Sequence, residues 1–325
     1  MSQRTRVGVI RGGPSSEYEV SLKTGAAVLG AIDRGRYDVR DLFIDRAGTW
    51  HSWGKPVAPE RALRQLDVAF LALHGTYGED GQIQRLLERH RIPFTGSGSL
   101  ASSVAMNKVM TKHVLRDAGL RMPAHRTVSW DDLSPQLALE LFRTFPQPSV
   151  IKPLNSGSSV GVSLARTYDE FLEALELGFT LSDQLLVEEY VKGTEATVGI
   201  LESFRDDPHY ALPEVEIRPA AHKTFFDWEA KYDGAVKEIC PGTFPQATKD
   251  ELARLARLVH RTLNLSHYSR ADFIVTPRGP YFLEVNTLPG LTESSLLPQS
   301  VSSVGVPFPG FLDHLITLAR APRRP

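Results

Sequence analysis

The first hundred residues alternate short apolar runs with stretches of helical periodicity, and this alternation limits the possible folds more than any other feature. The apolar runs are RVGVIRGG, VRDLFID and DVAFLALHG, and the stretch GQIQRLLERHRI has helical spacing. Strands that alternate with helices form a parallel sheet, because each parallel connection needs a crossover that is usually helical. We therefore predict an open parallel α/β domain for residues 1–96.

The loop RGGPSSE, which follows the first predicted strand, is expected to lie near a ligand. Ser16 and Glu19 have the spacing of a capping box, which predicts a helix that begins near Ser16. His74 ends another apolar strand. Open α/β sheets bind ligands beyond the carboxyl ends of their strands, so the loop and His74 are both candidates for a site. A lone histidine is more often structural, and that alternative stays open here.

The sequence pattern changes after residue 96. The stretch PFTGSGSLASSVAMNKVMTKHVLRDAGL predicts one long helix, and SVIKPLNSGSSVGVSLA predicts two strands joined by a Gly/Ser-rich turn. Such a pair forms an antiparallel hairpin. We predict a central lobe at 97–191 and a last lobe at 192–325, with a hinge near Lys192 and Gly193.

The hairpin SRADFIVTPRGPYFLEVNT carries three oxygen-bearing side chains. Asp272 lies on its first strand, and Glu284 and Asn286 lie two positions apart on its second. Side chains alternate along a strand, so Glu284 and Asn286 share a face, where burial without partners would be costly. A few hard oxygen ligands are typical of Mg²⁺ that also binds nucleotide phosphates. The alternative is a polar face that meets solvent.

Two lysines are placed to flank a triphosphate. Lys108 precedes the central sheet, and Lys152 ends an apolar strand before the loop LNSGSSVGV, whose backbone N–H groups can close over phosphates. The loop lacks the order of a Walker P-loop, and a plain hairpin turn is the alternative. Glu188, Glu189 and Glu195 flank the expected hinge, where they could hold a ribose or an adenine amine or could simply be solvated.

Composition excludes several classes of partner and compartment. The formal net charge of −1 argues against bulk binding to nucleic acid, which needs a basic surface. No run reaches the roughly 18 apolar residues that span a bilayer. Cys240 is the single cysteine, so an internal disulfide is impossible and a reducing compartment fits. We expect a cytoplasmic protein that binds small molecules rather than nucleic acid or a membrane.

Seven segments together resemble the D-alanine:D-alanine ligase family of the ATP-grasp superfamily. They are GGPSSEYEVSL, LHGTYGEDG, GSGSLASSVAMNK, VIKPLNSGSSVGV, EAKY, RADF and LEVNTLPGLTESSLLP, and they run in order through the whole chain. The resemblance implies an α/β ATP-grasp fold of three lobes, with ATP held between two antiparallel sheets. It also implies two Mg²⁺ ions, for which Mn²⁺ can substitute, and ATP-dependent synthesis of D-Ala-D-Ala for peptidoglycan through a D-alanyl phosphate. Homodimers are common among relatives.

The resemblance also assigns roles to individual residues. As metal ligands it implies Asp272, Glu284 and Asn286. As residues that bind ATP it implies Lys108, Lys152, Ser158, Ser159, Glu188, Glu189, Tyr190, Val191, Glu195 and Lys231. As catalytic residues it implies Glu17, Ser158, Tyr232, Arg270 and Gly290, and as further substrate-binding residues His74, Ser295 and Leu296.

Two positions deserve comparison with the family pattern. Asn107 precedes Lys108 where many relatives carry Asp, and Tyr232 stands where relatives that use D-lactate carry Phe. Tyr232 therefore points to the dipeptide-forming activity. Two alternatives remain: a ligase that uses another acceptor, such as D-lactate or D-serine, and a nucleotide-binding regulator that has lost its chemistry. The regulator is disfavoured because all the implied catalytic residues are present.

Overall fold

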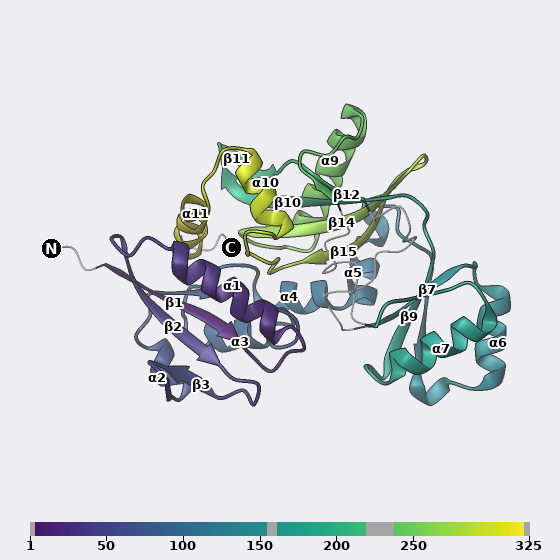
Figure 1. Cartoon of the computed structure of the whole chain (residues 1–325), viewed down its shortest axis with the longest axis horizontal. Coiled ribbons are helices and arrows are strands. Elements are labelled where there is room, and N and C mark those ends of the chain that lie inside the picture. The colour runs from purple at the N-terminus through teal and green to yellow at the C-terminus, as the bar shows by residue number, and fades with distance from the viewer. Residues whose placement is uncertain (1–3, 155–160, 219–236, 322–325) are drawn as a thin grey trace.

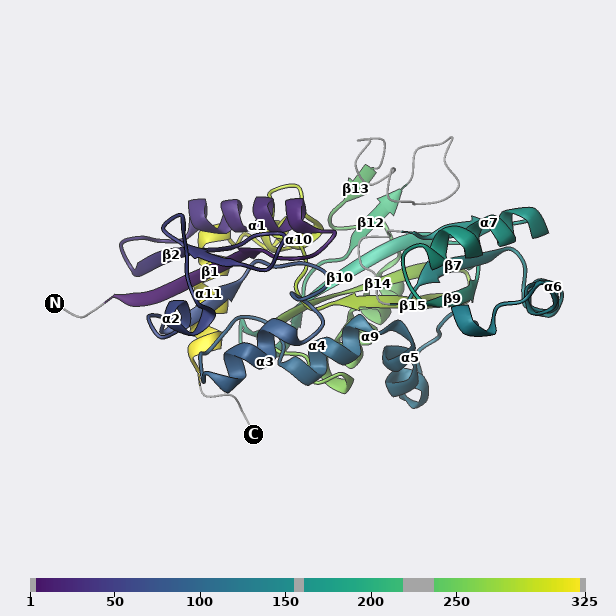
Figure 2. The ribbon, with the colours of Figure 1, turned by 90° about the horizontal axis from the view of Figure 1, so that it is seen from below.

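The computed structural model describes residues 4–154, 161–218 and 237–321, which form three sheets with helices packed around them. In Figures 1 and 2 the C-terminal sheet lies between the purple N-terminal lobe and the teal central lobe. None of the helices in these ranges combines the length and apolar character needed to cross a bilayer.

The N-terminal sheet has five strands in the order β4-β3-β2-β1-β5. Strand β1 pairs in parallel with both β2 and β5, which confirms the predicted parallel sheet. The short strands β3 and β4 extend it in antiparallel fashion. The elements are β1 (Thr5–Gly12), α1 (Tyr18–Ala31), β2 (Tyr37–Ile44), β3 (Trp50–Ser52), β4 (Lys55–Pro56), α2 (Pro59–Leu63), β5 (Val68–Leu71) and α3 (Gln82–Arg89).

The loop between β1 and α1 lies where the sequence predicted it, but the predicted capping box is wrong. Helix α1 begins at Tyr18, and its N-cap residue Glu17 makes no side-chain capping hydrogen bond. Instead, the backbone N–H of Glu17 donates to Ser15 Oγ at 3.1 Å. Gly12 has φ +90°, and an added Cβ would lie 2.1 Å from the carbonyl oxygen of Ile44. Only glycine allows the chain to leave β1 in this direction.

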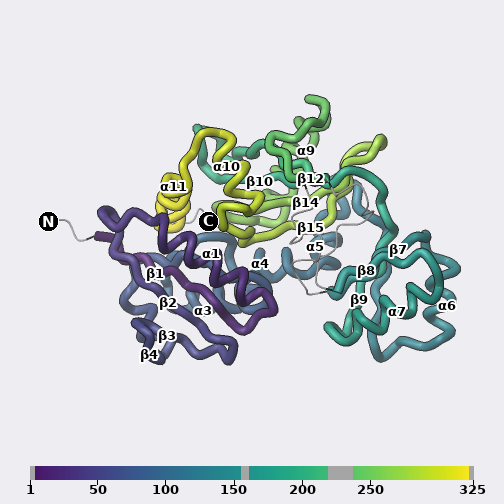
Figure 3. Tube along the Cα trace, viewed as in Figure 1, coloured from purple at the N-terminus to yellow at the C-terminus, as the bar shows by residue number. Residues whose placement is uncertain are grey.

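The C-terminal end of the chain returns to the N-terminal lobe. Helix α10 (Leu296–Ser303) is followed by α11 (Phe308–Arg320), which packs against α1 and β5. Figure 3 shows this yellow segment beside the purple N-terminal lobe. Phe311, Leu312 and Leu315 of α11 are fully buried in the same core as Val9 and Phe70. Both ends of the chain therefore contribute to one apolar core.

The central lobe contains an antiparallel sheet of four strands in the order β6-β9-β7-β8, which confirms the predicted small antiparallel sheet. Helices α6 and α7 pack against each other, and α7 packs on the sheet. The elements are β6 (His125–Ser129), α6 (Pro135–Thr144), β7 (Ser149–Pro153), β8 (Ser163–Ala165), α7 (Tyr168–Phe179) and β9 (Gln184–Glu189).

The single long helix predicted before the central sheet is wrong, because Asn107 divides it into α4 (Ser99–Met106) and α5 (Lys108–Leu115). Asn107 has extended backbone angles, φ −87° and ψ 105°, and its side chain accepts a hydrogen bond from the backbone N–H of Met110. Asparagine is a strong N-cap residue because its side chain satisfies an N–H group of the first turn. Lys108 therefore becomes the first residue of a new helix.

The C-terminal lobe is built on a six-stranded sheet with the path β13-β12-β10-β14-β15 and with β11 paired to β10. Helix α9 packs on β10, β11, β14 and β15, where Leu252, Leu255 and Val259 join the core. The elements are β10 (Thr194–Phe204), β11 (Asp207–Ala211), β12 (Val215–Arg218), β13 (Lys237–Ile239), α9 (Gln246–Thr262), β14 (Tyr268–Thr276) and β15 (Gly279–Asn286). The residue limits predicted for the three lobes stay a prediction.

Candidate active site

The candidate metal-binding side chains meet on one face of the β14–β15 hairpin. In the strand register Asp272 faces Glu284, and Arg270 faces Asn286. Asp272 is buried and accepts hydrogen bonds from Asn286 Nδ2 at 3.0 Å and from Thr197 Oγ1 at 2.6 Å. The structure thus brings together the three oxygen-bearing residues that the sequence singled out.

Arg270 places a fixed positive charge beside these carboxylates. Its Nε and Nη2 atoms donate to the two oxygens of Asp272, each at 2.9 Å. Burial alone would lower the pKa of Arg270, but the Asp272 and Glu284 carboxylates raise it above its ordinary value. The guanidinium therefore stays charged and is held in a bidentate geometry.

Lys108 reaches the same face from the central part of the chain. Its Nζ atom lies 3.2 Å from Glu284 Oε2. The position follows from the helix break at Asn107, because Lys108 begins α5, and α4 packs against β15.

Lys152 belongs to a buried charge cluster of the central sheet. Its Nζ lies 2.5 Å from Glu188 Oε2, and Lys112 Nζ lies 2.7 Å from Glu188 Oε1. Burial would raise the pKa of Glu188, but the two ammonium groups lower it to about 2. Lys112 was missed in the sequence analysis, although it lies four residues after Lys108 and thus on the same face of α5.

Electrostatics connect the central sheet with the C-terminal sheet. Burial lowers the pKa of Lys152, whereas Glu188 and then Glu284 and Glu195 of the C-terminal lobe raise it, and the net effect is a raised pKa. Lys152 is therefore close enough to interact with carboxylates of both sheets. A positively charged side chain in this position suits a polyanionic ligand held between the sheets.

The remaining candidate residues of this region follow β9. Glu189 ends the strand, and its side chain accepts a hydrogen bond from the backbone N–H of Ala124 at 3.0 Å. The backbone N–H of Tyr190 donates to the carbonyl oxygen of Pro148 at 3.0 Å, which holds the chain just before Val191. Residues 188–190 are thus held beside β6 and β7 by strand pairing and by these side-chain and backbone hydrogen bonds.

His74 connects the N-terminal lobe to the loop after β15. Its Nδ1 atom lies 2.9 Å from the carbonyl oxygen of Leu288, and its Nε2 atom lies 2.8 Å from Thr24 Oγ1. A carbonyl oxygen can only accept, so Nδ1 carries the proton and Nε2 accepts from the threonine hydroxyl. Burial lowers the pKa of His74 to about 4, which keeps the imidazole neutral.

Glu79 holds the same loop and was not among the predicted site residues. Its carboxylate accepts from the backbone N–H groups of Gly75, at 2.9 Å, and Leu288, at 3.1 Å. Burial and the nearby Glu17 raise the pKa of Glu79 to about 8. Gly75 has φ +67°, and an added Cβ would lie 2.9 Å from Glu17 Oε1, so the carboxyl groups of Glu17 and Glu79 both lie next to this glycine. His74 and Glu79 both hold Leu288 through hydrogen bonds.

Gly290 and Ser295 lie together at the start of α10. An added Cβ at Gly290 would lie 2.9 Å from Ser295 Oγ. Ser295 Oγ accepts a hydrogen bond from the backbone N–H of Thr292 at 3.1 Å, and Leu296 is the first residue of the helix. Ser158, Ser159, Lys231 and Tyr232 lie outside the described residues.

Replacement of His74 by asparagine is expected to change how stability depends on pH. The pKa of His74 is about 4 in the folded protein and about 6.5 in the unfolded chain. Between pH 4 and pH 6.5 the unfolded state therefore binds more protons than the folded state. His74 therefore makes the protein less stable as pH falls from about 6.5 to 4, by up to about 3 kcal/mol.

Denaturant unfolding of the wild-type protein and His74→Asn at several pH values measures this effect as a difference between the two proteins. That difference cancels the contribution of Glu79, whose raised pKa acts in the opposite direction. Parallel pH profiles for the two proteins would contradict the neutral, buried state of His74.

Two family models together match nearly the whole chain. The model described as D-ala D-ala ligase N-terminus matches residues 6–59 and 52–97, and the model described as D-ala D-ala ligase C-terminus matches residues 114–317. These matches cover the N-terminal sheet, the central sheet and the C-terminal sheet.

Curated relatives and solved structures match the same family as the two family models. The chain is 41% identical to a D-alanine–D-alanine ligase of Geobacter sulfurreducens over 319 residues, which cover 97% of this chain and 94% of the relative. It is also 41% identical to the D-alanine–D-alanine ligase of Geotalea uraniireducens, over 97% of this chain and 95% of the relative.

Among solved structures, the D-alanine–D-alanine ligase of Bacillus anthracis complexed with ATP has a TM-score of 0.80 and 33% identity, and the match covers 98% of this chain and 97% of that one. The VanG D-Ala:D-Ser ligase of Enterococcus faecalis has a TM-score of 0.85 and 29% identity, over 98% of this chain and 100% of that one. The structural matches confirm the predicted ATP-grasp fold. By its family models and its relatives, the chain belongs to the D-alanine–D-alanine ligase family.

Proposed function

We propose that this protein is an ATP-dependent D-alanine:D-alanine ligase that makes the D-Ala-D-Ala dipeptide for peptidoglycan synthesis. One observation supports this proposal above the others: the oxygen donors of β14 and β15 lie beside Lys108 and within electrostatic reach of Lys152. Carboxylates and cations at one place are what a metal-bound triphosphate requires. The relatives at 41% identity carry this activity in their names.

The donor set fits Mg²⁺, and this cofactor belongs to the proposal. Asp272, Glu284 and Asn286 offer oxygen atoms on one face, where Arg270 and Lys108 offset the negative charge. Mg²⁺ prefers such ligands and leaves positions for phosphate oxygens and water. We propose two ions, which Mn²⁺ can replace. When bound, the metal supplies neutralisation of phosphate charge and orientation of the transferring group.

The proposed reaction has two steps. The carboxylate oxygen of the first D-alanine attacks the γ-phosphorus of ATP, ADP leaves, and a D-alanyl phosphate forms. The neutral amine of the second D-alanine then attacks the acyl carbon, the C–O bond to phosphate breaks, and inorganic phosphate leaves as the peptide bond forms, with the surplus amine proton passing to the departing phosphate. Lys108 and Lys152 position and neutralise the phosphates, which is the main requirement of phosphoryl transfer. Arg270 and the N–H of Gly290 stabilise the oxyanion, a role worth about 3 kcal/mol per donor.

The other candidate residues complete the proposed site. Glu17 and His74 lie at the subsite for the first D-alanine, and Ser295 and Leu296 lie at the subsite for the second. Segment 188–191 lines the adenine, and Glu195 binds the ribose. From the family pattern, Ser158 and Tyr232 join Glu17 in orienting the first substrate. Ser159 and Lys231 approach the phosphates.

Three further features follow from the same proposal. The lobe limits are 1–96, 97–191 and 192–325, with ATP between the central and C-terminal lobes. The protein acts in the cytoplasm, where ATP is available. A homodimer is the proposed oligomeric state, in line with the family.

Acceptor competition tests the proposed substrate against the alternative acceptors. The similarity to a D-Ala:D-Ser ligase structure makes D-serine a specific alternative, although the identity is 29% against 41% for the D-alanine–D-alanine ligases. Incubation with ATP, D-alanine and an equal concentration of D-serine or D-lactate is expected to give D-Ala-D-Ala as the main product by mass spectrometry. A main product that contains D-serine or D-lactate would contradict the proposed acceptor.

A further inference from the structure

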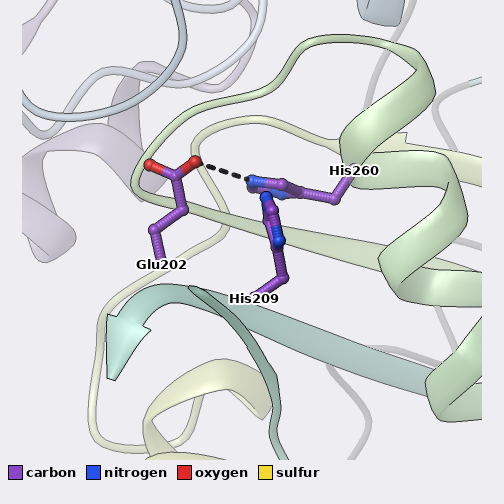
Figure 4. A group of neighbouring side chains, drawn as sticks. All are labelled: Glu202, His209 and His260. Carbon is purple, nitrogen blue, oxygen red and sulfur yellow. Dashed lines mark ion pairs between the residues drawn. The ribbon is translucent and has the colours of Figure 1, made fainter. Parts of the chain in front are cut away.

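Three potential metal ligands meet at a second place in the C-terminal lobe. They are Glu202 of β10, His209 of β11 and His260 of α9, and Figure 4 shows the side chains pointing toward one another. One ligand atom from each residue lies within 4.8 Å of the others. Glu202 is five residues along β10 from Thr197, the partner of Asp272, so the cluster lies about 17 Å from the candidate active site.

The strand register creates half of the cluster. Glu202 and His209 are direct partners in the antiparallel pairing of β10 with β11. Directly opposite residues project to the same face of a sheet, with Cβ atoms about 5 Å apart. Helix α9 packs on these two strands and brings His260 over the pair. The pairing of the two strands and the packing of the helix therefore bring the three side chains together.

His260 is fully buried and one of its ring nitrogens has no hydrogen-bond partner. Its Nδ1 lies 2.8 Å from Ser269 Oγ, whereas Nε2 is buried without a hydrogen bond. The nearest carboxylate oxygen, Glu202 Oε1, is 3.6 Å from Nε2, which is too long for a hydrogen bond. When Nδ1 donates to Ser269, Nε2 presents a lone pair to the cluster. A buried nitrogen of this kind needs a partner.

A hydrogen bond from outside the cluster orients Glu202, as the bond to Ser269 orients His260. Its Oε2 accepts a hydrogen bond from the backbone N–H of His267 at 2.6 Å, which leaves Oε1 directed at His260. Metal sites usually hold their ligands through such outer contacts, which fix the ring orientation of histidine and the direction of the carboxylate. Here the contacts of Ser269 and His267 provide both.

We propose that Glu202, His209 and His260 bind one divalent transition-metal ion, with Zn²⁺ as the best fit and water as the fourth ligand. Two imidazoles and one carboxylate are a common Zn²⁺ ligand set, whereas Mg²⁺ prefers oxygen ligands alone. Tetrahedral Zn²⁺ with bonds of about 2.0–2.1 Å needs ligand atoms about 3.3 Å apart. Glu202 Oε1 and His260 Nε2, 3.6 Å apart, already lie near this spacing, and the ligand atoms of the whole cluster, with His209, lie within 4.8 Å of one another. Glu202 and His209 are partly exposed, so the ion can enter from solvent.

The bound ion has a structural role. It joins the β10–β11 hairpin to α9, and the same hairpin strand continues to Thr197 beside Asp272. The site does not depend on ligase activity, so its test is independent of the proposed reaction.

Equilibrium dialysis of the full-length protein against Zn²⁺, with Mg²⁺ and ADP in excess to occupy the nucleotide site, tests the proposal. The variants are Glu202→Gln and His209→Gln, because both residues are partly exposed and their replacement leaves the core intact. His113→Gln is the control, since His113 is an exposed histidine of α5.

Wild-type protein and His113→Gln are expected to bind one Zn²⁺ and to unfold at higher temperature when Zn²⁺ is added. Each cluster variant is expected to bind that ion at least about 100-fold more weakly, because the loss of an outer contact alone costs about 10–100-fold. Equal Zn²⁺ stoichiometry and affinity in all four proteins, or no Zn²⁺ bound by the wild-type protein, would overturn the proposal and leave Glu202, His209 and His260 as a group of side chains that packs without a metal.

Discussion

Replacement of Glu284 by glutamine is expected to reduce ligase turnover by at least about 100-fold while leaving the fold intact. Glu284 faces Asp272 in the hairpin register, and its carboxylate lies 3.2 Å from Lys108. The variant keeps the size of the side chain but removes one negative charge from the proposed metal site. Loss of even an outer-shell contact typically costs 10–100-fold in metal affinity or activity, so the loss of a ligand should cost more.

Steady-state phosphate release at several Mg²⁺ concentrations measures this effect. Glu293→Gln serves as the control, because Glu293 is an exposed glutamate seven residues beyond β15. Thermal unfolding of both variants shows whether the fold is kept. Near-full turnover of Glu284→Gln with Mg²⁺ would contradict the metal assignment.

Replacement of Glu188 by glutamine is expected to destabilise the protein by about 3–5 kcal/mol at pH 7, the usual cost of removing one partner from a buried ion pair. The Glu188 side chain is 2% exposed and the Lys112 side chain is 1% exposed. Without the carboxylate, Lys112 and Lys152 remain as neighbouring cations, and the Lys112 side chain is almost fully buried. Burial already lowers the pKa of Lys112, and the variant loses the charge that opposes this effect.

The pKa of Glu188 also predicts how the free energy of unfolding depends on pH. The pKa of Glu188 is about 2 in the folded protein and about 4.5 in the unfolded chain. Its stabilisation is therefore complete above about pH 4.5 and is lost as pH falls toward 2. Urea unfolding at pH 7 and at lower pH measures the difference between wild type and Glu188→Gln, which should shrink in acid.

Glu189→Gln is the matched control for this experiment. Glu189 is the next residue of β9 and is half-buried rather than buried, and a glutamine oxygen can still accept from Ala124. We expect a change within about 0.5 kcal/mol. A similar loss of stability in the two variants would show that the ion pairs around Glu188 are not the cause.

Local sequence signals predicted the elements whose boundaries depend on their own residues. The stretch YDEFLEALELGF has helical spacing and forms α7, where Thr167 and Glu170 form a complete capping box. Ser16 and Glu19 have the same spacing, yet no capping box forms there: α1 begins later, at Tyr18, and its N-cap residue Glu17 is buried beside Gly75. Tertiary contacts of a side chain can thus override a local pattern.

Other parts of the fold needed information that no short window contains. The return of α11 to the N-terminal lobe depends on packing between the two ends of the chain. The division of the expected long helix at Asn107 is a local feature by contrast, because the Asn107 side chain caps the backbone N–H of Met110, three residues further along. Residues 46–64 form the strands β3 and β4, which extend one edge of the sheet, and then helix α2.

The candidate site was partly visible in the sequence. Alternation along β15 placed Glu284 and Asn286 on one face, and a short turn brought Asp272 opposite. Lys112 and Glu79 were missed because their importance comes from burial and from partners far away in the chain, Glu188 and Leu288. The cluster of Glu202, His209 and His260 joins residues 58 positions apart and follows no known spacing.

The most direct test of the proposed function is ATP-dependent phosphate release with D-alanine as the only amino acid, with product identification by mass spectrometry and L-alanine as the control. We expect phosphate and D-Ala-D-Ala in equal amounts with D-alanine, and neither product with L-alanine. Binding of ATP without release of phosphate, or phosphate release without the dipeptide mass, would contradict the assignment as a D-alanine:D-alanine ligase.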